Sequence, residues 1–476
     1  MTDAKSSYTT QRRNHWGLVA SSLSEDPGWN RLYHRRLAEI YQSLIPPGLS
    51  VLELGCGQGD LLASLNPSEG VGIDFSGEMI RAAKHKHPGL RFIESDVHDF
   101  EWPEKFDVII LSDLVNDVWD VQTVFQNMRG LCDSHTRIII NTYSRLWELP
   151  LAAVRRLKLA KPLLNQNWLT VEDINNLLQL SDLEMIRNWS EVLCPFQIPI
   201  VEPFCNKFLA KLWPFRHGAL TNFVVARPAA TNDARQDKPL VSVIVPARNE
   251  AGNIPEIFSR APEMGRGTQL VFVEGHSTDD TYATIQREIS ANPHRNCKLL
   301  RQSGEGKGDA VRLGFDHADG DVLMILDADL TVRPEDLPRF CNALLSGKGD
   351  FINGVRLVYP MENHAMRFAN QVGNKMFSLI FSWLLGQPIK DTLCGTKVLW
   401  KRDYKVTADN RSYFGTIDPF GDFDLILGAA RLNLKIIDLP VRYGDRKYGD
   451  TNIRRWQHGL LLLRMAVRAA FKLKFV

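Results

Sequence analysis

The chain lacks the features of a membrane-spanning or secreted protein. None of its apolar runs reaches the roughly 18 uninterrupted apolar residues that a membrane span needs. The nearest candidates are 376–385, which is too short, and 460–476, which is interrupted by four basic residues. Residues 1–16 contain no apolar core, so no secretory signal is expected there. We expect a cytoplasmic protein, with peripheral contact at the inner face of a membrane as the alternative.

Paired cysteines and an excess of charge are also missing. The seven cysteines are scattered, odd in number and form no CxxC pair. This argues against a disulfide framework and against a zinc site. The formal net charge is only +2, so general binding to polyanions is not indicated and no nucleic-acid partner is expected.

The length of 476 residues exceeds one ordinary hydrophobic core, and the composition is that of a globular protein. The segment 229–239 is polar, alanine-rich and bounded by prolines, as expected of a linker. We therefore predict a first domain over 1–228, a second over 240–453, and a basic C-terminal helix over 454–476.

The first half alternates short apolar runs with helical patterns after a polar lead-in and a helix over Trp29 to Leu44. This alternation predicts a doubly wound α/β domain of Rossmann-like type. The expected strands are Val51–Leu54, Gly70–Ile73, Arg91–Glu94, Phe106–Leu111 and Arg137–Asn141.

A glycine motif, ELGCGQG, follows the first expected strand, and GIDFS and ESDVHDF follow the next two. Glycines allow tight turns and the close approach of a ligand. With these motifs, residues 51–143 resemble the class I S-adenosylmethionine-dependent methyltransferases, whose closing antiparallel strands we expect at 183–189 and 220–226. A nicotinamide fingerprint is disfavoured, because the third glycine comes one residue early.

The resemblance implies a binding site for S-adenosylmethionine. Asp74 would hold the ribose hydroxyls, and Asp113 would lie near the methyl sulfonium. The full set of implied cofactor-binding residues is Glu53, Gly55, Gly57, Gly59, Asp74, Asp96, Val97 and Asp113.

The methyl acceptor is not identified by the sequence. Methyl transfer needs alignment, and it needs a base only if the acceptor proton is not acidic. Asp117 and Asp120 cluster with Asp113 after the fourth strand, although they also fit the polar face of a helix. His98 follows the adenine loop, and His15 and His34 lie in the lead-in.

The second half repeats the strand–helix pattern and contains a pair of carboxylates at a strand end. The expected strands are Val241–Val245, Leu270–Val273, Lys298–Arg301 and Val322–Leu326. Asp327 and Asp329 follow the last of these. Two crowded carboxylates suit a divalent cation that also binds substrate phosphates. The alternative is that both acids cap the next turn.

With VPARNE, GEGKGDA and DAD in this order, residues 241–452 resemble the family 2 glycosyltransferases of the GT-A fold. The resemblance implies a nucleotide-diphosphate sugar donor, with Mg²⁺ or Mn²⁺ held by Asp327 and Asp329. Glu274 stands where the family usually has an aspartate. The implied donor-binding residues are Pro246, Arg248, Asn249, Glu250, Glu274, Lys307 and Asp327.

The stretch IKDTLCGTK, followed by FGDFDLILGAAR, is similar to the polyprenyl-phosphate sugar transferases, with Thr396 where phenylalanine is usual. Inverting transfer needs a carboxylate base unless the acceptor is already a phosphate anion. The candidate bases are Asp391 and Asp424, favoured equally, and Asp422. Three cations near the end of this region are candidates for binding donor diphosphate or acceptor phosphate: Arg442, Arg446 and Lys447.

The tail 454–476 combines six basic residues with leucines and has no acid. It fits an interfacial helix on an anionic membrane as well as a helix packed on its own domain. We predict a bifunctional enzyme that methylates and moves a sugar from a nucleotide-sugar to a polyprenyl-phosphate or glycan acceptor. The alternative is a glycosyltransferase with a soluble acceptor and a non-catalytic first domain.

Overall fold

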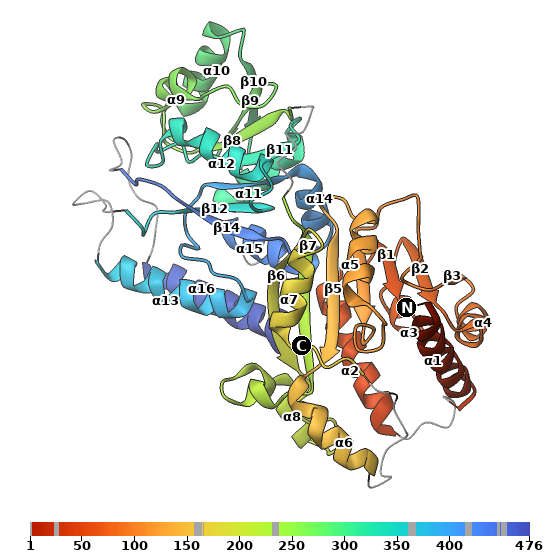
Figure 1. Ribbon diagram of the computed structural model, residues 1–476. Helices are drawn as coiled ribbons and strands as arrows, with labels where there is room; N and C mark the ends of the chain where they lie inside the picture. The colour runs from red at the N-terminus through yellow and green to blue at the C-terminus, as the bar shows by residue number, and fades with distance from the viewer. Residues whose placement is uncertain are drawn as a thin grey trace. The chain divides into compact units, whose positions relative to one another are not determined.

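The computed structural model describes residues 2–22, 28–156, 164, 166–230, 238–359, 368–414, 421–444, 448 and 455–476. The chain divides into two compact units, Met1–Ala229 with Lys474–Val476, and Ala230–Leu473. Each unit is built on one seven-stranded sheet (Figure 1). The prediction of two α/β domains is confirmed.

The first sheet has the strand order β3-β2-β1-β4-β5-β7-β6. Its first five strands are parallel, and β7 pairs antiparallel with both β5 and β6. The expected closing antiparallel strands are thus present. The strands are β1 (Ser50–Leu54), β2 (Glu69–Asp74), β3 (Arg91–Glu94), β4 (Val108–Ser112), β5 (Arg137–Tyr143), β6 (Leu183–Glu191) and β7 (Thr221–Pro228).

Helices cover both faces of this sheet because successive strand residues point to opposite sides. Leu52, Ile109 and Ile138 join one buried cluster, whereas Val51, Val108 and Ile139 join another. The helices of the unit are α1 (Thr2–Ser22), α2 (Gly28–Leu44), α3 (Asp60–Ser64), α4 (Gly77–Lys86), α5 (Val121–Gly130), α6 (Glu148–Arg156), α7 (Val171–Gln179) and α8 (Val201–Lys207), with short turns η2 (Arg145–Trp147), η3 (Leu209–Lys211) and η4 (Phe215–Gly218).

The lead-in expected to be merely polar is the helix α1. Its apolar content is low, so the hydrophobic periodicity of an amphipathic helix is absent. Polar contacts fix it instead, because Tyr8, Arg12 and Trp16 recur every four residues on one face and bind the loop after β4.

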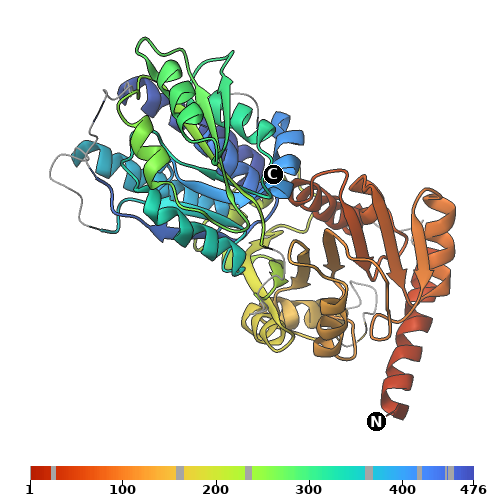
Figure 2. The same ribbon diagram turned by 90° about the horizontal axis from the view of Figure 1, so that it is seen from above.

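The second sheet has the strand order β10-β9-β8-β11-β13-β12-β14, in which β13 runs antiparallel to β11 and β12. Figure 2 shows its strands between two layers of helices. The strands are β8 (Val241–Ala247), β9 (Thr268–Glu274), β10 (Asn296–Arg301), β11 (Val322–Ile325), β12 (Phe351–Val355), β13 (Lys397–Trp400) and β14 (Ile436–Pro440).

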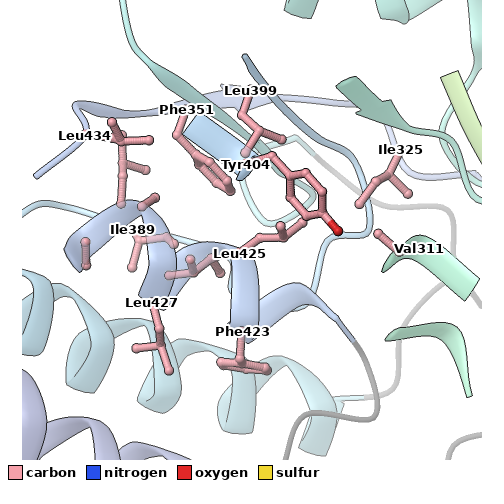
Figure 3. Close-up of a cluster of buried hydrophobic side chains, with 14 of the residues drawn as sticks. Val311, Ile325, Phe351, Ile389, Leu399, Tyr404, Phe423, Leu425, Leu427 and Leu434 are labelled. Atoms are coloured by element: carbon pink, nitrogen blue, oxygen red, sulfur yellow. The ribbon is translucent and has the colours of Figure 1, made fainter. Parts of the chain in front are cut away.

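One face of the second sheet carries the larger cluster of buried side chains. Figure 3 shows Phe351, Leu399 and Phe423 of this cluster, with neighbours from other elements. Each fully buried side chain of this size stabilises the fold by about 1.5–3 kcal/mol. The helices of the unit are α9 (Ile254–Arg260), α10 (Thr281–Ala291), α11 (Lys307–His317), α12 (Leu337–Leu345), α13 (Phe368–Leu385), α14 (Lys401–Asp409), α15 (Asp422–Arg431) and α16 (Arg455–Ala469), with turns η5 (Pro334–Asp336), η6 (Arg411–Tyr413) and η7 (Ala470–Lys474).

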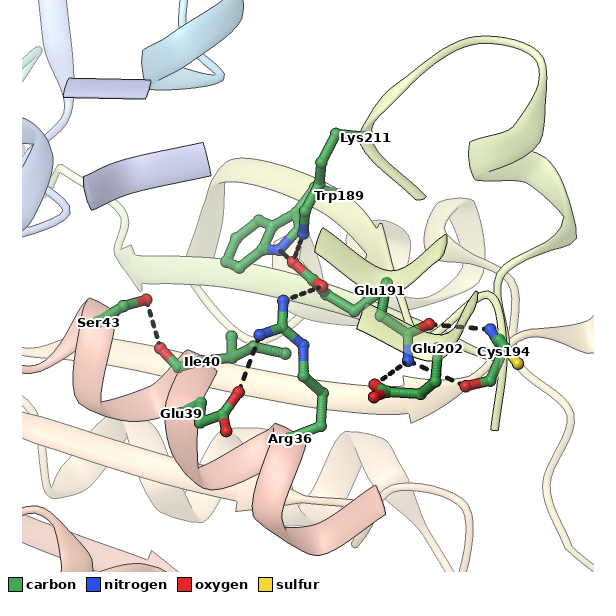
Figure 4. A network of polar contacts seen from close by, with 10 residues as sticks. Arg36, Glu39, Ile40, Ser43, Trp189, Glu191, Cys194, Glu202 and Lys211 are labelled. Carbon is green, nitrogen blue, oxygen red and sulfur yellow. Dashed lines mark hydrogen bonds and ion pairs between the residues drawn. The ribbon is translucent and has the colours of Figure 1, made fainter. Parts of the chain in front are cut away.

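A buried charge network ties the end of β6 to α2 and η3 in the first unit (Figure 4). The Glu191 carboxylate accepts from the Lys211 ammonium and from Trp189 Nε1 at 3.0 Å, and lies 3.4 Å from an Arg36 nitrogen. The side chains of Glu191 and Lys211 are each only 3% exposed. Removing one member of such a pair leaves a buried charge without compensation.

We expect Glu191→Gln to lower the free energy of unfolding of the first unit by about 3–5 kcal/mol, the usual cost of breaking a buried ion pair. Glu39→Gln is the matched control, since Glu39 also pairs with Arg36 but its side chain is 42% exposed. The control should cost less than about 1 kcal/mol. Urea unfolding followed by fluorescence measures both, and equal stabilities would contradict the assignment.

Candidate functional site

The glycine loop of the first unit turns sharply between β1 and α3. Gly55, Gly57 and Gly59 have φ of 73°, 52° and 76°, the left-handed region that favours glycine. A Cβ on Gly59 would overlap the ring of Phe92. The amides of Gly55 and Cys56 both donate to the Ile73 carbonyl, at 2.8 and 2.9 Å. The loop therefore lies directly against the end of β2.

Two carboxylates support this loop. Glu53 is buried and accepts from the Leu62 amide at 3.1 Å, and burial raises its pKa to about 8. Asp74 accepts from the Gly57 amide at 3.0 Å and from the Ser76 amide at 2.9 Å. Burial also raises the pKa of Asp74. Glu53 binds the amide of Leu62 in α3, the helix that follows the loop. Asp74 ends β2 beside the loop amides.

The segment after β3 forms a second side of the same sheet edge. His98 Nδ1 lies 2.6 Å from Asp96 Oδ1, and its Nε2 accepts from the Asp120 amide at 3.2 Å. His98 therefore connects the loop after β3 with the loop before α5. Val97 is buried. These contacts position the loop.

Asp113 lies at the carboxyl end of β4 with a φ of 55°. One carboxylate oxygen accepts from the Tyr33 hydroxyl at 2.9 Å and from Asn141 Nδ2 at 2.7 Å. The Tyr33 hydroxyl also lies 3.2 Å from Thr221 Oγ1. Burial raises the pKa of Asp113 to about 7, despite both hydrogen bonds. A carboxylate with this pKa can accept or release a proton near neutral pH.

Helix α1 borders the same edge, which the sequence did not predict. Arg12 Nε and Trp16 Nε1 donate to the two oxygens of Asp117 at 2.8 and 2.7 Å. Arg13 Nε donates to the Phe75 carbonyl at 3.1 Å, one residue after Asp74. The i, i+4 spacing of Arg12 and Trp16 was the available signal. Asp117 is therefore an anchor for α1 rather than part of an open polar helix face.

In the second unit, the ends of β8 and β9 are joined by polar contacts. Asn249, with a φ of 57°, accepts from the Thr278 amide at 2.8 Å. Glu274 accepts from the Ser277 amide at 2.6 Å, and the Glu250 amide donates to Thr281 Oγ1 at 2.9 Å. Glu250 and Glu274 are buried, while Arg248 is exposed and Pro246 half-buried. These residues form one platform at the carboxyl edge of the sheet.

The DAD segment follows β11 at this edge. Lys307 Nζ lies 2.6 Å from Asp327 Oδ1. Burial alone would lower the pKa of Lys307, but the charges of Asp327 and Asp422 raise it above its usual value. Asp329 accepts from the amide and hydroxyl of Thr331 at 3.1 and 2.8 Å. Asp329 therefore also caps a turn, as the alternative interpretation of the motif expected.

Whether a divalent cation fits here depends on the type and number of the available ligands. Among the described residues, no three His, Cys, Asp or Glu side chains gather in a way that could hold a metal by themselves. Two carboxylates with outside oxygens are, however, a usual Mg²⁺ arrangement when substrate phosphates complete the shell. Asp327 and Asp329 fit that role, and the Lys307 ammonium lies beside Asp327.

Asp391 is saturated with hydrogen bonds. Its carboxylate is fully buried and accepts from Arg356 Nε at 2.7 Å and from the second Arg356 nitrogen at 2.9 Å. Asn374 Nδ2 and the Leu393 amide donate to it as well, at 2.8 and 3.1 Å. Burial would raise its pKa, but Arg356 holds the pKa below the usual value. This arrangement orders the surrounding loop and disfavours Asp391 as the base.

The other two candidate carboxylates start α15. Arg411 Nε donates to Asp424 at 2.9 Å, and Arg312 lies 3.7 Å from the same oxygen. Asp422 lies 3.2 Å from the buried ammonium of Lys397, which also donates to the Cys394 carbonyl. Of the three candidates, Asp422 is the one whose charge acts on Lys307.

Glycines bring these segments into contact. A Cβ on Gly421 would lie 2.8 Å from the Cα of Gly308, so the start of α11 packs on the start of α15. A Cβ on Gly395 would overlap both the Asp327 carboxylate and the Lys307 ammonium. Lys307, Asp327, Lys397 and Asp422 therefore converge on one place.

The candidate phosphate-binding cations are only partly described. Arg446 and Lys447 lie outside the described residues. Arg442 is exposed, and its guanidinium lies 5.4 Å from the Tyr359 ring centroid. It borders a pocket of about 300 Å³ lined by Arg333, Glu335, Asp336, Arg339, Tyr359 and Arg442.

Sequence reasoning missed Arg356, Asn374 and Lys397 as parts of this site. Lys397 stands at the end of the quoted segment IKDTLCGTK, next to Thr396, and its type could have marked it as an anion partner. Arg356 and Asn374 come from a strand end and a helix distant in sequence, and carry no local motif.

Comparisons with known proteins agree with this division. The family model described as methyltransferase domain matches residues 45–191, and the one described as glycosyl transferase family 2 matches residues 242–408. A glycosyltransferase named AglJ from Haloferax volcanii is 30% identical over 217 residues, covering 45% of this chain and 66% of that protein. Dolichol-phosphate mannosyltransferase from Pyrococcus furiosus is 30% identical over 219 residues, covering 45% of this chain and 59% of that protein.

The chain thus spans two thirds or less of the length of these curated relatives. Among solved structures, magnesium protoporphyrin IX methyltransferase from Synechocystis PCC 6803 with bound SAM is 15% identical and has a TM-score of 0.33. That similarity covers 47% of this chain and 97% of the other. The family matches confirm the predicted methyltransferase and family 2 glycosyltransferase domains.

The raised pKa of Asp113 makes stability depend on pH. Its pKa is near 4 in the unfolded chain and about 7 in the fold, so the folded state holds the proton more tightly. The fold should lose stability as pH rises from about 4 to about 7. Because the side chain is only half-buried, we expect a change of about 2 kcal/mol.

Asp113→Asn should remove that part of the pH dependence, whereas Asp99→Asn, at a carboxylate that is 74% exposed, should leave it unchanged. Urea unfolding across this pH window provides the measurement. Parallel curves for the wild type and Asp113→Asn would show that Asp113 does not titrate near neutral pH.

Proposed function

We propose a bifunctional enzyme, starting from a chain that contains both a methyltransferase domain and a family 2 glycosyl transferase domain. The second unit transfers a sugar from a nucleotide-diphosphate donor to a polyprenyl phosphate or glycan. The first unit transfers a methyl group from S-adenosylmethionine. The observation that supports the sugar transfer best is the convergence of Lys307, Asp327, Asp422 and Lys397 against Gly395.

The donor occupies the carboxyl edge of the second sheet in this proposal. The platform of Asn249, Glu250 and Glu274 receives the nucleoside, and Arg248 is exposed beside it. Lys307 binds the diphosphate. Mg²⁺ or Mn²⁺ on Asp327 and Asp329 would neutralise charge on the departing nucleotide. The positive charge of Lys307 is already offset by Asp327. The diphosphate therefore needs the metal ion as a second cation.

The acceptor decides whether a base is needed. A phosphate acceptor is already an anion, whereas a hydroxyl acceptor must lose a proton. All three candidate carboxylates pair with a cation, and Asp422 is the base we propose for a hydroxyl acceptor because its charge also acts on Lys307. A relative whose name includes dolichol-phosphate favours the lipid phosphate. The second candidate is a soluble acceptor, with the first unit serving only to bind S-adenosylmethionine or to scaffold.

Methyl transfer is assigned to the edge between the glycine loop and Asp113. The loop amides and Asp74 bind the methionine and ribose ends of the cofactor, and Asp96 with Val97 flanks the adenine. Asp113 accepts a proton from the methyl acceptor at the opposite end, with Tyr33 holding its carboxylate. The sulfonium supplies the methyl group, and alignment supplies most of the rate.

A lipid acceptor is consistent with the surface of α13 and α16, which pack on each other. No helix among the described residues has both the length and the hydrophobicity to cross a bilayer. Helix α16 buries Leu462 and Met465, while Leu463 and Val467 are 47% and 50% exposed. Exposed apolar side chains on α13 and exposed cations on the C-terminal segment add to this surface: Met376, Leu379, Trp383, Arg464, Arg468 and Lys472.

Asp327→Asn/Asp329→Asn should abolish Mn²⁺-dependent binding of UDP and GDP, and sugar turnover with it, because both proposed metal ligands lose their charge. Calorimetry with and without Mn²⁺ measures the binding. Asp409→Asn is the control, since Asp409 is exposed on α14. Equal metal-dependent affinity in all three proteins would refute the metal site.

Asp74→Asn should weaken binding of S-adenosylmethionine about tenfold or more, the usual effect of losing a charged hydrogen bond to ribose. Glu69→Gln, at the exposed start of β2, is the control. Calorimetric titration of the full chain decides the matter. Absence of any binding in the wild type would support the scaffold alternative.

Leu463→Asp/Val467→Asp should weaken binding to anionic vesicles about tenfold and leave transfer to a water-soluble acceptor analogue unchanged. Leu180→Asp is the control, at a leucine that is 64% exposed on the first unit. Vesicle flotation gives the affinity. Unchanged flotation of the double variant would favour the soluble-acceptor candidate.

A further inference from the structure

The first unit displays a second apolar surface, which neither domain family accounts for. Most of it comes from one segment of 23 residues, 196–218, between β6 and β7. Eight large apolar side chains of this segment are 42–84% exposed: Phe196, Ile198, Ile200, Val201, Phe204, Leu212, Trp213 and Phe215. We call this set the 196–215 face. Exposed apolar side chains gathered in one segment are typical of an interaction site.

The segment is held in place rather than loosely attached. Asn206 Nδ2 donates to the Cys194 carbonyl at 2.9 Å, and the Cys194 amide donates to Asn206 Oδ1 at 2.8 Å. Lys211 is fixed by its buried pair with Glu191 (Figure 4). The exposed side chains therefore stand on a rigid base, and their exposure is not the result of an unfolded loop.

The backbone at Ile200 is strained in a way that exposes its side chain. Ile200 has a φ of 69° and is 84% exposed. A β-branched residue at positive φ is a genuine outlier and costs of order 1–3 kcal/mol. Ile200 precedes α8, and its carbonyl accepts from the Phe204 amide at 3.2 Å, so this backbone starts the helix while the apolar side chain stays in solvent.

The charges around the face favour an anionic apolar phase. Segment 196–218 contains one acidic residue, Glu202, which accepts from Asn206 at 2.7 Å. Lys207 and Arg216 reach the surface beside the apolar groups. Trp213, with Phe204 and Phe215, supplies the aromatic groups that occupy the level of lipid headgroups. A bordering pair of leucines, Leu146 and Leu149, is 67% and 79% exposed.

A chain of contacts links the end of segment 196–218 to Asp113. Trp147 Nε1 donates to the Gly218 carbonyl at 3.0 Å, which ties the end of the segment to the turn before α6. Three residues later, Thr221 begins β7, and its hydroxyl contacts Tyr33, the partner of Asp113.

We propose that the 196–215 face docks on an anionic lipid bilayer, so that the methyl acceptor of the first unit is a lipid-borne molecule. The identity of the acceptor class rests on the proposed methyltransferase function, whereas docking itself does not.

The test uses the full chain with vesicles of phosphatidylcholine containing about 30% phosphatidylglycerol. Ile200→Gly removes an apolar side chain at a φ that glycine adopts freely, so it should not destabilise the unit. We expect about tenfold weaker vesicle binding for Ile200→Gly, and a similar loss for Trp213→Asp. Leu180→Ser, on the same unit, should leave the affinity unchanged.

A direct readout uses Trp213 as a probe. Vesicles made with brominated lipid quench only those indoles that reach the acyl boundary. The wild type should lose more fluorescence on binding than Trp213→Phe does. Equal quenching in the two proteins, or equal affinity of Ile200→Gly and the wild type, would overturn the proposal.

The remaining outcomes are also decisive. If Ile200→Gly converts a dimer into a monomer in sedimentation while vesicle binding is unchanged, the face joins two copies of the chain and the lipid proposal fails. Binding of S-adenosylmethionine is measured separately in the same variants. If the wild type does not bind S-adenosylmethionine, the methyltransferase assignment fails. The vesicle experiments still decide whether the face docks on lipid.

Discussion

The placement of negative charge at the carboxyl ends of parallel strands is the constraint on which both sites depend. Each sheet brings several acids to one edge, where their mutual repulsion must be offset. In the second unit Lys307 meets Asp327 at 2.6 Å and Lys397 meets Asp422 at 3.2 Å. In the first unit backbone amides do this for Asp74 and Glu53. The acids of the second edge thus have ammonium partners, whereas those of the first edge have backbone amide partners.

The two edges consequently differ in chemistry. At the second edge, Lys307 and Lys397 pair with the carboxylates of Asp327 and Asp422. At the first edge burial dominates, so the pKa of Asp113 rises to about 7 and that of Glu53 to about 8. Asp391 shows the opposite result, because Arg356 outweighs an even more complete burial. Carboxyl groups with similar pKa values in water thus acquire different pKa values from their surroundings.

Much of this architecture could be predicted from the sequence, because it rests on local patterns. The runs that form β1 to β5 are short, apolar and followed by polar residues, and the three glycines mark a turn that needs positive φ. Helix α1 was missed because its contacts are polar and its partner, Asp117, lies about a hundred residues away. The environment of Asp391 could not be predicted from the sequence either, because Arg356 and Asn374 come from two other elements.

The contact between Gly308 and Gly421 has a consequence for how this site tolerates substitution. No room exists for a carbon atom beyond the backbone at Gly421. The first residues of α11 and the residue before α15 therefore contact each other through main chain alone. Neither segment can be lengthened, shifted or given a side chain there unless the other changes with it. A transfer of either segment into another protein therefore has to include both segments.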